Sequence, residues 1–135
     1  MSPGRTVILD AEGLAALVRR ERRAWEVMHG ALTGDQRVVV PASTLTEVMT
    51  GRPSDAGVWH VVNRLPVHSI DTTTAARAGG LRERAAAARR KKRDLSMDAQ
   101  VVATAMAYLP ATIITSDPDD IGALARGLDI SVVAL

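Results

Sequence analysis

The chain has 135 residues, a length typical of one domain, with 17 lysine and arginine residues against 15 aspartate and glutamate residues. It has no cysteine, which excludes disulfides, zinc–thiolate sites and a cysteine nucleophile, and no phenylalanine, so the core must be aliphatic. No apolar run approaches the roughly 18 residues that span a membrane, and the first residues lack the apolar stretch of a signal peptide. We therefore expect one soluble, cytoplasmic domain over residues 1–135.

The N-terminal part of the chain predicts two strands separated by a helix. Residues 6–10 are a short run rich in β-branched residues, which is typical of a buried strand. Apolar positions at helical spacing predict a helix over residues 11–32, and Gly34-Asp35 marks a turn. A second strand follows at residues 37–40 and ends at Pro41.

The middle of the chain predicts two short helices and a third strand. Ser43 or Thr44 can cap a helix that Gly51-Arg52-Pro53 ends. A further short helix is expected over residues 57–63, and residues 66–70 predict the third strand.

The second half continues the alternation of helices and strands. Asp71 or Thr72 can cap a long helix rich in alanine and arginine that runs to about Arg90. The elements expected after it are a helix at 96–108, a strand at 111–115, a helix at 118–126 and a strand at 130–134. Strands that alternate with helices, and are apolar throughout, indicate an α/β fold with a parallel sheet covered on both faces.

Four acidic residues occupy unusual places in this pattern: Asp10, Glu47, Asp98 and Asp117. Asp10 and Asp117 follow strands, whereas Glu47 and Asp98 interrupt apolar helical patterns near their start. Burying a charged carboxylate in apolar surroundings costs folding free energy unless a partner compensates its charge. If the four converge, a cation such as magnesium or manganese between them would compensate their charge.

A structural role is the alternative for each of these acids. Acidic side chains in a first helical turn cap backbone amides and interact favourably with the helix macrodipole. This alternative has about even weight for Asp98 and Glu47, and more for Asp117 and Asp120, which frame Pro118 at a helix start. Asp10 is the acid least easily explained in this way.

The chain resembles the PIN-domain ribonucleases, and among them the VapC-type toxins of bacterial toxin–antitoxin pairs, along nearly its whole length. The order and spacing of four segments carry the resemblance. They are Val7-Ile8-Leu9-Asp10-Ala11, Val40-Pro41-Ala42 with Leu45-Thr46-Glu47-Val48, Leu95-Ser96-Met97-Asp98-Ala99 with Val102-Ala103-Thr104-Ala105, and Ile114-Thr115-Ser116-Asp117-Pro118-Asp119-Asp120-Ile121.

The resemblance implies a three-layer fold with a five-stranded parallel sheet in the order 3-2-1-4-5. It also implies a catalytic quartet of Asp10, Glu47, Asp98 and Asp117 that binds Mg²⁺ or Mn²⁺ and hydrolyses RNA phosphodiester bonds. Within the quartet, Asp10 and Asp98 are expected to bind the metal directly, whereas Asp117 and Glu47 are expected to act through water.

The chain departs from the pattern at two positions. Glu12 stands where many relatives have a small polar residue, and Gln100 stands where many have histidine. Glu12 is expected to face solvent, with a place in the metal shell as the alternative. Asp120 is expected to be a helix-start residue rather than an outer acid of the site.

Basic residues are candidates for holding the substrate backbone. The run Arg89, Arg90, Lys91, Lys92 and Arg93 is the main candidate, and a solvated helix end is the equally weighted alternative. Thr115 either forms a hydrogen bond within the site or is simply the last residue of its strand. The tryptophans Trp25 and Trp59 are expected in the core or at an interface.

The resemblance also implies partners, namely an RNA substrate, a cognate antitoxin whose C-terminal segment reaches the site, and a second copy of the chain. Homodimerisation could use the alanine-rich helix at residues 75–88. The alternative is a non-catalytic module of the same fold that binds RNA or protein. A dinucleotide-binding or P-loop enzyme is disfavoured because neither glycine-rich motif follows a predicted strand.

Overall fold

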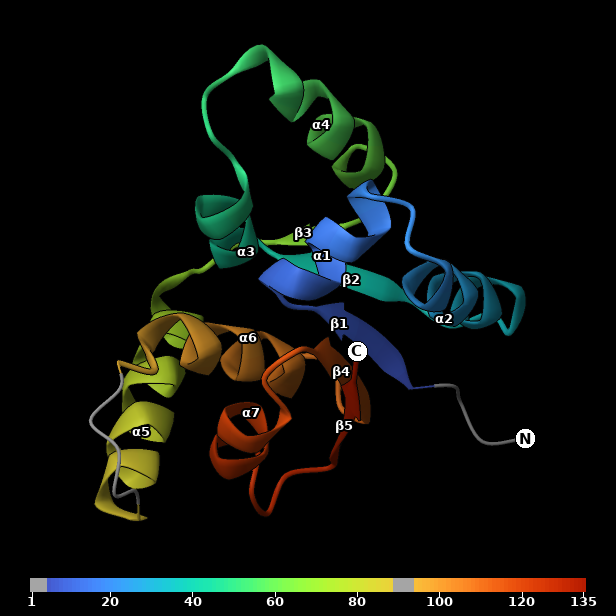
Figure 1. The fold of residues 1–135 in the computed structure, drawn as a ribbon. Coiled ribbons are helices and arrows are strands. Elements are labelled where there is room, and N and C mark those ends of the chain that lie inside the picture. The colour runs from blue at the N-terminus through green and yellow to red at the C-terminus, as the bar shows by residue number, and fades with distance from the viewer. Residues whose placement is uncertain (1–4, 89–93) are drawn as a thin grey trace.

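A computed structural model of the chain describes residues 5–88 and 94–135. Its centre is one parallel sheet in the order β3-β2-β1-β4-β5, with helices on both faces (Figure 1). The strands are β1 (Thr6–Leu9), β2 (Val38–Pro41), β3 (Val67–His68), β4 (Ala111–Thr115) and β5 (Ile130–Ala134). The predicted α/β class and strand order are confirmed, although β3 is shorter than the expected strand at residues 66–70.

The helices cover the two faces of the sheet as separate layers. They are α1 (Ala11–Val18), α2 (Arg22–Thr33), α3 (Ala42–Val48), a 3₁₀ turn η1 (Pro53–Asp55), α4 (Ala56–Val62), α5 (Thr72–Ala88), α6 (Ser96–Met106) and α7 (Pro118–Leu124). Alternate strand residues face opposite layers, because successive side chains of a strand point to opposite faces. Val7 and Leu9 pack with α1, α2 and α4, whereas Ile8 packs with α5, α6 and α7.

Strand β1 lies at the point where the strand order reverses. Its residues pair with β2 on one side, through Ile8 and Val39, and with β4 on the other, through Leu9 and Ile114. In open parallel sheets, ligands bind outside the carboxyl ends of the strands at this reversal. The residues that follow β1 and β4 therefore lie at the place where a site is expected.

The predicted helix over residues 11–32 is wrong in one respect, because it is two helices. Arg20 has a φ of 58°, in the left-handed region. The amide of Arg20 donates to Leu17 O and that of Glu21 donates to Ala16 O. These two bonds form a Schellman motif, which ends α1 and lets α2 leave in a new direction. The charged segment between the two apolar patterns is the sequence signal of this break.

The predicted caps had different outcomes. Ser43 and Thr44 do not cap α3, because the helix begins at Ala42, directly after β2. The Thr44 hydroxyl instead donates to the carbonyl of Leu9 at 3.2 Å and ties α3 to the end of β1. Asp71 does cap α5, where its carboxylate accepts the amide N–H of Thr74 at 2.8 Å.

Within the described part of the chain, no helix combines the length and apolar character needed to cross a membrane.

Candidate metal centre

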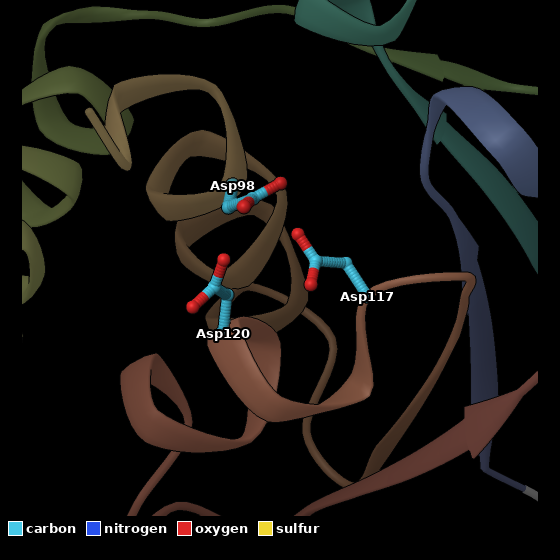
Figure 2. Close-up of side chains that lie close together, drawn as sticks. All are labelled: Asp98, Asp117 and Asp120. Atoms are coloured by element: carbon cyan, nitrogen blue, oxygen red, sulfur yellow. The ribbon is translucent and has the colours of Figure 1, made fainter. Parts of the chain in front are cut away.

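Three aspartates form an acidic cluster at the carboxyl edge of the sheet. One carboxylate oxygen from each of Asp98, Asp117 and Asp120 lies within 4.8 Å of the other two. Figure 2 shows Asp98 projecting from α6, Asp117 from the segment between β4 and α7, and Asp120 from α7, with the side chains directed toward one another. All three are partly buried. We call these residues the acidic triad.

The end of β4 explains how Asp117 is placed. Thr115 is fully buried, and its hydroxyl oxygen accepts the amide N–H of Asp117 at 2.9 Å. Pro118 then begins α7, as proline is favoured in the first helical turn. Asp117 occupies the N-cap position, yet its side chain makes no capping hydrogen bond. The helix-cap alternative for Asp117 therefore does not account for its carboxylate.

Asp120 joins the triad although the sequence favoured a role at the helix start. It does lie in the first turn of α7, three residues after Asp117. Residues three apart in a helix lie on the same side, so the two carboxylates share one direction. This spacing is the sequence signal that could have identified Asp120 as a site residue.

Asp10 lies at the adjacent strand end but outside the triad. It follows β1, is 7% exposed, and its Oδ1 accepts the amide N–H of Gly13 at 2.7 Å as the N-cap of α1. Burial raises the pKa of Asp10, and hydrogen bonds from the Thr115 side chain and the Gly13 amide partly oppose this effect. The negative charges of Glu12 and Asp117 raise the same pKa further. Because Thr115 bonds to both acids, it links Asp10 to the triad residue Asp117.

Gly13 makes the cap of α1 possible. A Cβ atom at this position would lie 3.1 Å from the carbonyl oxygen of Ile114 and 3.4 Å from Asp10 Oδ1. The contact with Ile114 O is too close for an unstrained side chain. The glycine therefore lets α1 start directly against the end of β4, which brings Asp10 and Thr115 together.

The two glutamates near the site are placed differently from the triad. Glu47 is an exposed residue of α3, one helical turn after Thr44, and is not a member of the triad. Glu12 is also exposed, and its carboxylate lies 3.7 Å from a guanidinium nitrogen of Arg19. Glu12 thus faces solvent, as expected from the sequence. The basic run of residues 89–93 lies outside the described residues.

The triad fits a hard divalent cation. Carboxylate oxygens are the ligands that Mg²⁺ and Mn²⁺ prefer, and Mg²⁺ binds oxygen at about 2.0–2.1 Å. Two oxygens on opposite sides of such an ion are thus about 4.2 Å apart. The triad oxygens, within 4.8 Å of one another, would need to move by less than about 1 Å to share an ion.

No family model matches the chain, and no curated protein matches it significantly. Solved structures do match, at low sequence identity. A chain of VapBC2 from Rickettsia felis bound to a promoter DNA fragment is 12% identical, with a TM-score of 0.69 over 94% of this chain and 98% of that chain. A chain of DNA-bound VapBC from Salmonella typhimurium is 16% identical, with a TM-score of 0.66 over 96% and 98%.

A chain of FitAcB from Neisseria gonorrhoeae gives a similar result. It is 19% identical, with a TM-score of 0.65 over 95% of this chain and 96% of that chain. The resemblance expected from the sequence is thus confirmed as a likeness of fold to chains of VapBC and FitAB toxin–antitoxin complexes. This chain has the PIN-like fold of these neighbours.

Proposed function

We propose that the chain is a metal-dependent endoribonuclease, built as a single PIN domain over residues 1–135, and that it acts as the toxin of a toxin–antitoxin pair. The observation that carries the proposal is the acidic triad of Asp98, Asp117 and Asp120 at the strand-order reversal. Three carboxylates this close repel one another, and a divalent cation bound between them would offset that repulsion. The likeness of fold to VapBC and FitAB chains adds support.

In the proposed site, Asp98, Asp117 and Asp120 hold Mg²⁺ or Mn²⁺. The bound ion would supply Lewis-acid polarisation of a phosphoryl oxygen and a water ligand with a lowered pKa. Thr115, at the end of β4, holds Asp117 in position through its amide, and Asp10, which follows β1, adds a further carboxylate beside the metal. Glu47, an exposed residue of α3, is the fifth acid of the proposed site and orients water. Arg89, Arg90, Lys91, Lys92 and Arg93 would contact the RNA backbone.

An apolar groove supports the proposed antitoxin partner. It has a volume of about 740 Å³ and lies between α1, α2 and α4, where Leu17, Met28 and Val61 are among its lining residues. Arg20 and Arg64 also line it and add positive charge. Trp25, another lining residue, is 43% exposed, so of the two places expected for it, the core or an interface, only the interface remains. An amphipathic antitoxin segment with an apolar stripe and acidic flanks fits this groove.

The groove and the site share α1. Asp10 caps the start of this helix, and Leu17 and Val18 near its end line the groove. A helix of eight residues is about 12 Å long. A partner segment in the groove therefore needs only a short extension along α1 to reach the acidic residues, which matches an antitoxin that inhibits the site.

RNA cleavage by the purified chain tests the proposal. We expect cleavage of single-stranded RNA that requires added Mg²⁺ or Mn²⁺ and falls at least 100-fold in Asp98→Asn, in line with the loss of a metal-centred charge contact. Asp119→Asn is the matched control, because Asp119 is an exposed neighbour outside the triad. Equal activity in Asp98→Asn and wild type would refute the nuclease. RNA binding without metal uptake or cleavage would instead support the non-catalytic alternative.

A growth assay tests the toxin role separately. Induction of the wild-type chain is expected to arrest growth, whereas induction of Asp10→Asn is not. Homodimerisation is tested by sedimentation, where a monomer at micromolar concentration would contradict it.

A further inference from the structure

A second, smaller pocket lies between α5 and α6. It has a volume of about 180 Å³ and is lined by Ile70, by small residues of α5 that include Gly79, and by three polar residues: Arg82, Ser96 and Gln100. Ligand pockets for whole drug-sized molecules are roughly 300–1,000 Å³. This pocket is therefore suited to a single small polar group rather than to a complete nucleotide.

Hydrogen bonds hold the positive charge of the pocket in place. The Arg82 guanidinium donates to the Ser96 hydroxyl oxygen at 3.3 Å, and that hydroxyl donates to the carboxylate of Asp94 at 2.6 Å. The Arg82 guanidinium also lies 3.4 Å from Glu83, but this pair is exposed and such pairs contribute little. Arg82 is thus oriented by Ser96 while its side chain stays 45% exposed.

Gln100 adds a neutral donor to the pocket. Its side-chain amide donates to the sulfur of Met97 at 3.8 Å, which is a weak bond. Arg82 and Gln100 therefore offer N–H groups to a ligand with acceptor oxygens. A guanidinium fork is particularly suited to phosphate, because it can donate two parallel hydrogen bonds.

The pocket and the triad lie on opposite sides of α6. Ser96 and Gln100 are four residues apart and share the side that faces α5, whereas Asp98, midway between them, faces Asp117 and Asp120. A helix with its side chains is about 10–12 Å across. An RNA strand cut at the triad would cover this distance within a few nucleotides.

We propose that this pocket binds a backbone phosphate of the RNA substrate, a few nucleotides from the scissile bond, with Arg82 as its charged partner and Gln100 as a neutral donor. The inference rests on the proposed nuclease function. It assigns to the start of α6 two tasks on opposite sides, metal binding through Asp98 and substrate positioning through the pocket.

Filling the pocket tests the inference without a change of charge. A Cβ atom on either Gly79 or Gly80 meets nothing within 4 Å, and leucine is the better helix former, so both leucine variants should fold. Gly79 lines the pocket and Gly80 does not. In Mg²⁺-dependent cleavage of a labelled single-stranded RNA, Gly79→Leu is expected to raise KM about tenfold with kcat unchanged, as loss of uniform binding requires. Gly80→Leu should match wild type.

Removing the charge provides the second measurement. Arg82→Gln is expected to raise KM and to reduce the slope of log KM against log salt by about 0.7, the value for one phosphate contact on a single strand. Arg77→Gln, on the exposed side of the same helix, is the control for net charge. If Gly79→Leu and Arg82→Gln both behave like their controls while wild type cleaves RNA, the pocket inference is overturned and the nuclease stands. Absence of cleavage by wild type would overturn both.

Discussion

At the scale of single residues, Asp10 and Asp117 occupy corresponding places at adjacent strand ends but bond differently. The Asp10 carboxylate caps α1, whereas the Asp117 side chain makes no cap on α7. Thr115 connects the two, because it bonds to the Asp10 side chain and accepts the amide of Asp117. Asp10 is therefore a structural cap that Thr115 links to the acidic triad, and burial of its charge has a cost in folding free energy.

Replacing Asp10 by asparagine is expected to stabilise the metal-free protein at neutral pH. Burial raises the pKa of Asp10 above its ordinary value of 3.8, so the folded chain binds the proton more tightly than the unfolded chain. The free energy of unfolding of the wild-type chain therefore falls as pH rises from 3.8 through the raised pKa, because Asp10 must then be charged in the folded chain. An asparagine avoids this loss and keeps an oxygen for the Gly13 amide.

Thermal unfolding in EDTA measures this effect. The midpoint of Asp10→Asn should exceed that of wild type by a few degrees at neutral pH, and the difference should vanish below pH 3.8, where both side chains are neutral. Asp119→Asn removes an exposed charge and is the control. A lower midpoint for Asp10→Asn at neutral pH would contradict the free-energy cost assigned to the buried, charged carboxylate. If Asp10→Asn is more stable than wild type and also loses the proposed activity, this combination is typical of a functional residue.

At the scale of elements, the caps decide where the helices begin. The Asp71 carboxylate accepts the amide of Thr74 at the start of α5, and the backbone and side-chain hydrogen bonds from Thr74 hold its pKa below the ordinary value of 3.8. This helix carries Gly79 and Arg82, so its start also sets the position of the pocket between α5 and α6. The Asp71 cap thus helps to position the α5 residues that are proposed to contact the substrate.

Asp71→Ala is expected to lower the unfolding midpoint at neutral pH, and Asp71→Asn to lower it less, because asparagine also caps helices. The pKa of Asp71 is depressed in the fold, so its contribution is complete above pH 3.8 and is lost as pH falls through the folded pKa. Denaturation followed by circular dichroism from neutral pH downward checks this. A constant difference between wild type and Asp71→Ala at every pH would count against the charged cap.

The sequence predicted elements better than their ends. Apolar strand runs and helical spacing are strong signals, so the parallel pairing and most helices were expected correctly, whereas the strand order was expected only from the resemblance to PIN-domain ribonucleases. The break at Arg20 was missed because it depends on a left-handed residue that is not glycine. Asp120 and the Asp10 cap were also missed, although each has a local signal: Asp120 follows Asp117 by three residues, and Asp10 directly precedes a predicted helix.

At the scale of the whole molecule, the functional features lie on both helical layers. The apolar groove belongs to the layer of α1, α2 and α4, whereas the pocket between α5 and α6 belongs to the layer of α5, α6 and α7. The triad lies at the carboxyl edge of the sheet, with residues from α6, from the segment after β4 and from α7. In the proposal, the protein partner reaches these acids along α1 and the RNA substrate reaches them across α6.

The apolar groove predicts which substitution would prevent binding of the proposed antitoxin. Met28→Lys places a charge among the apolar lining residues and is expected to abolish co-purification with the antitoxin while RNA cleavage persists. Leu109→Lys is the control, since Leu109 is also exposed but does not line the groove. Retained co-purification of the Met28 variant would place the antitoxin elsewhere.

Calorimetric titration with Mn²⁺ tests the central claim, that the acidic triad holds the catalytic metal, most directly. Wild type and Asp119→Asn are predicted to bind Mn²⁺ with the same affinity, whereas Asp98→Asn and Asp120→Asn lose at least tenfold, as removal of a ligand requires. Circular dichroism would establish that each variant is folded. Equal Mn²⁺ affinity in all four proteins, or no binding by wild type, would contradict the account.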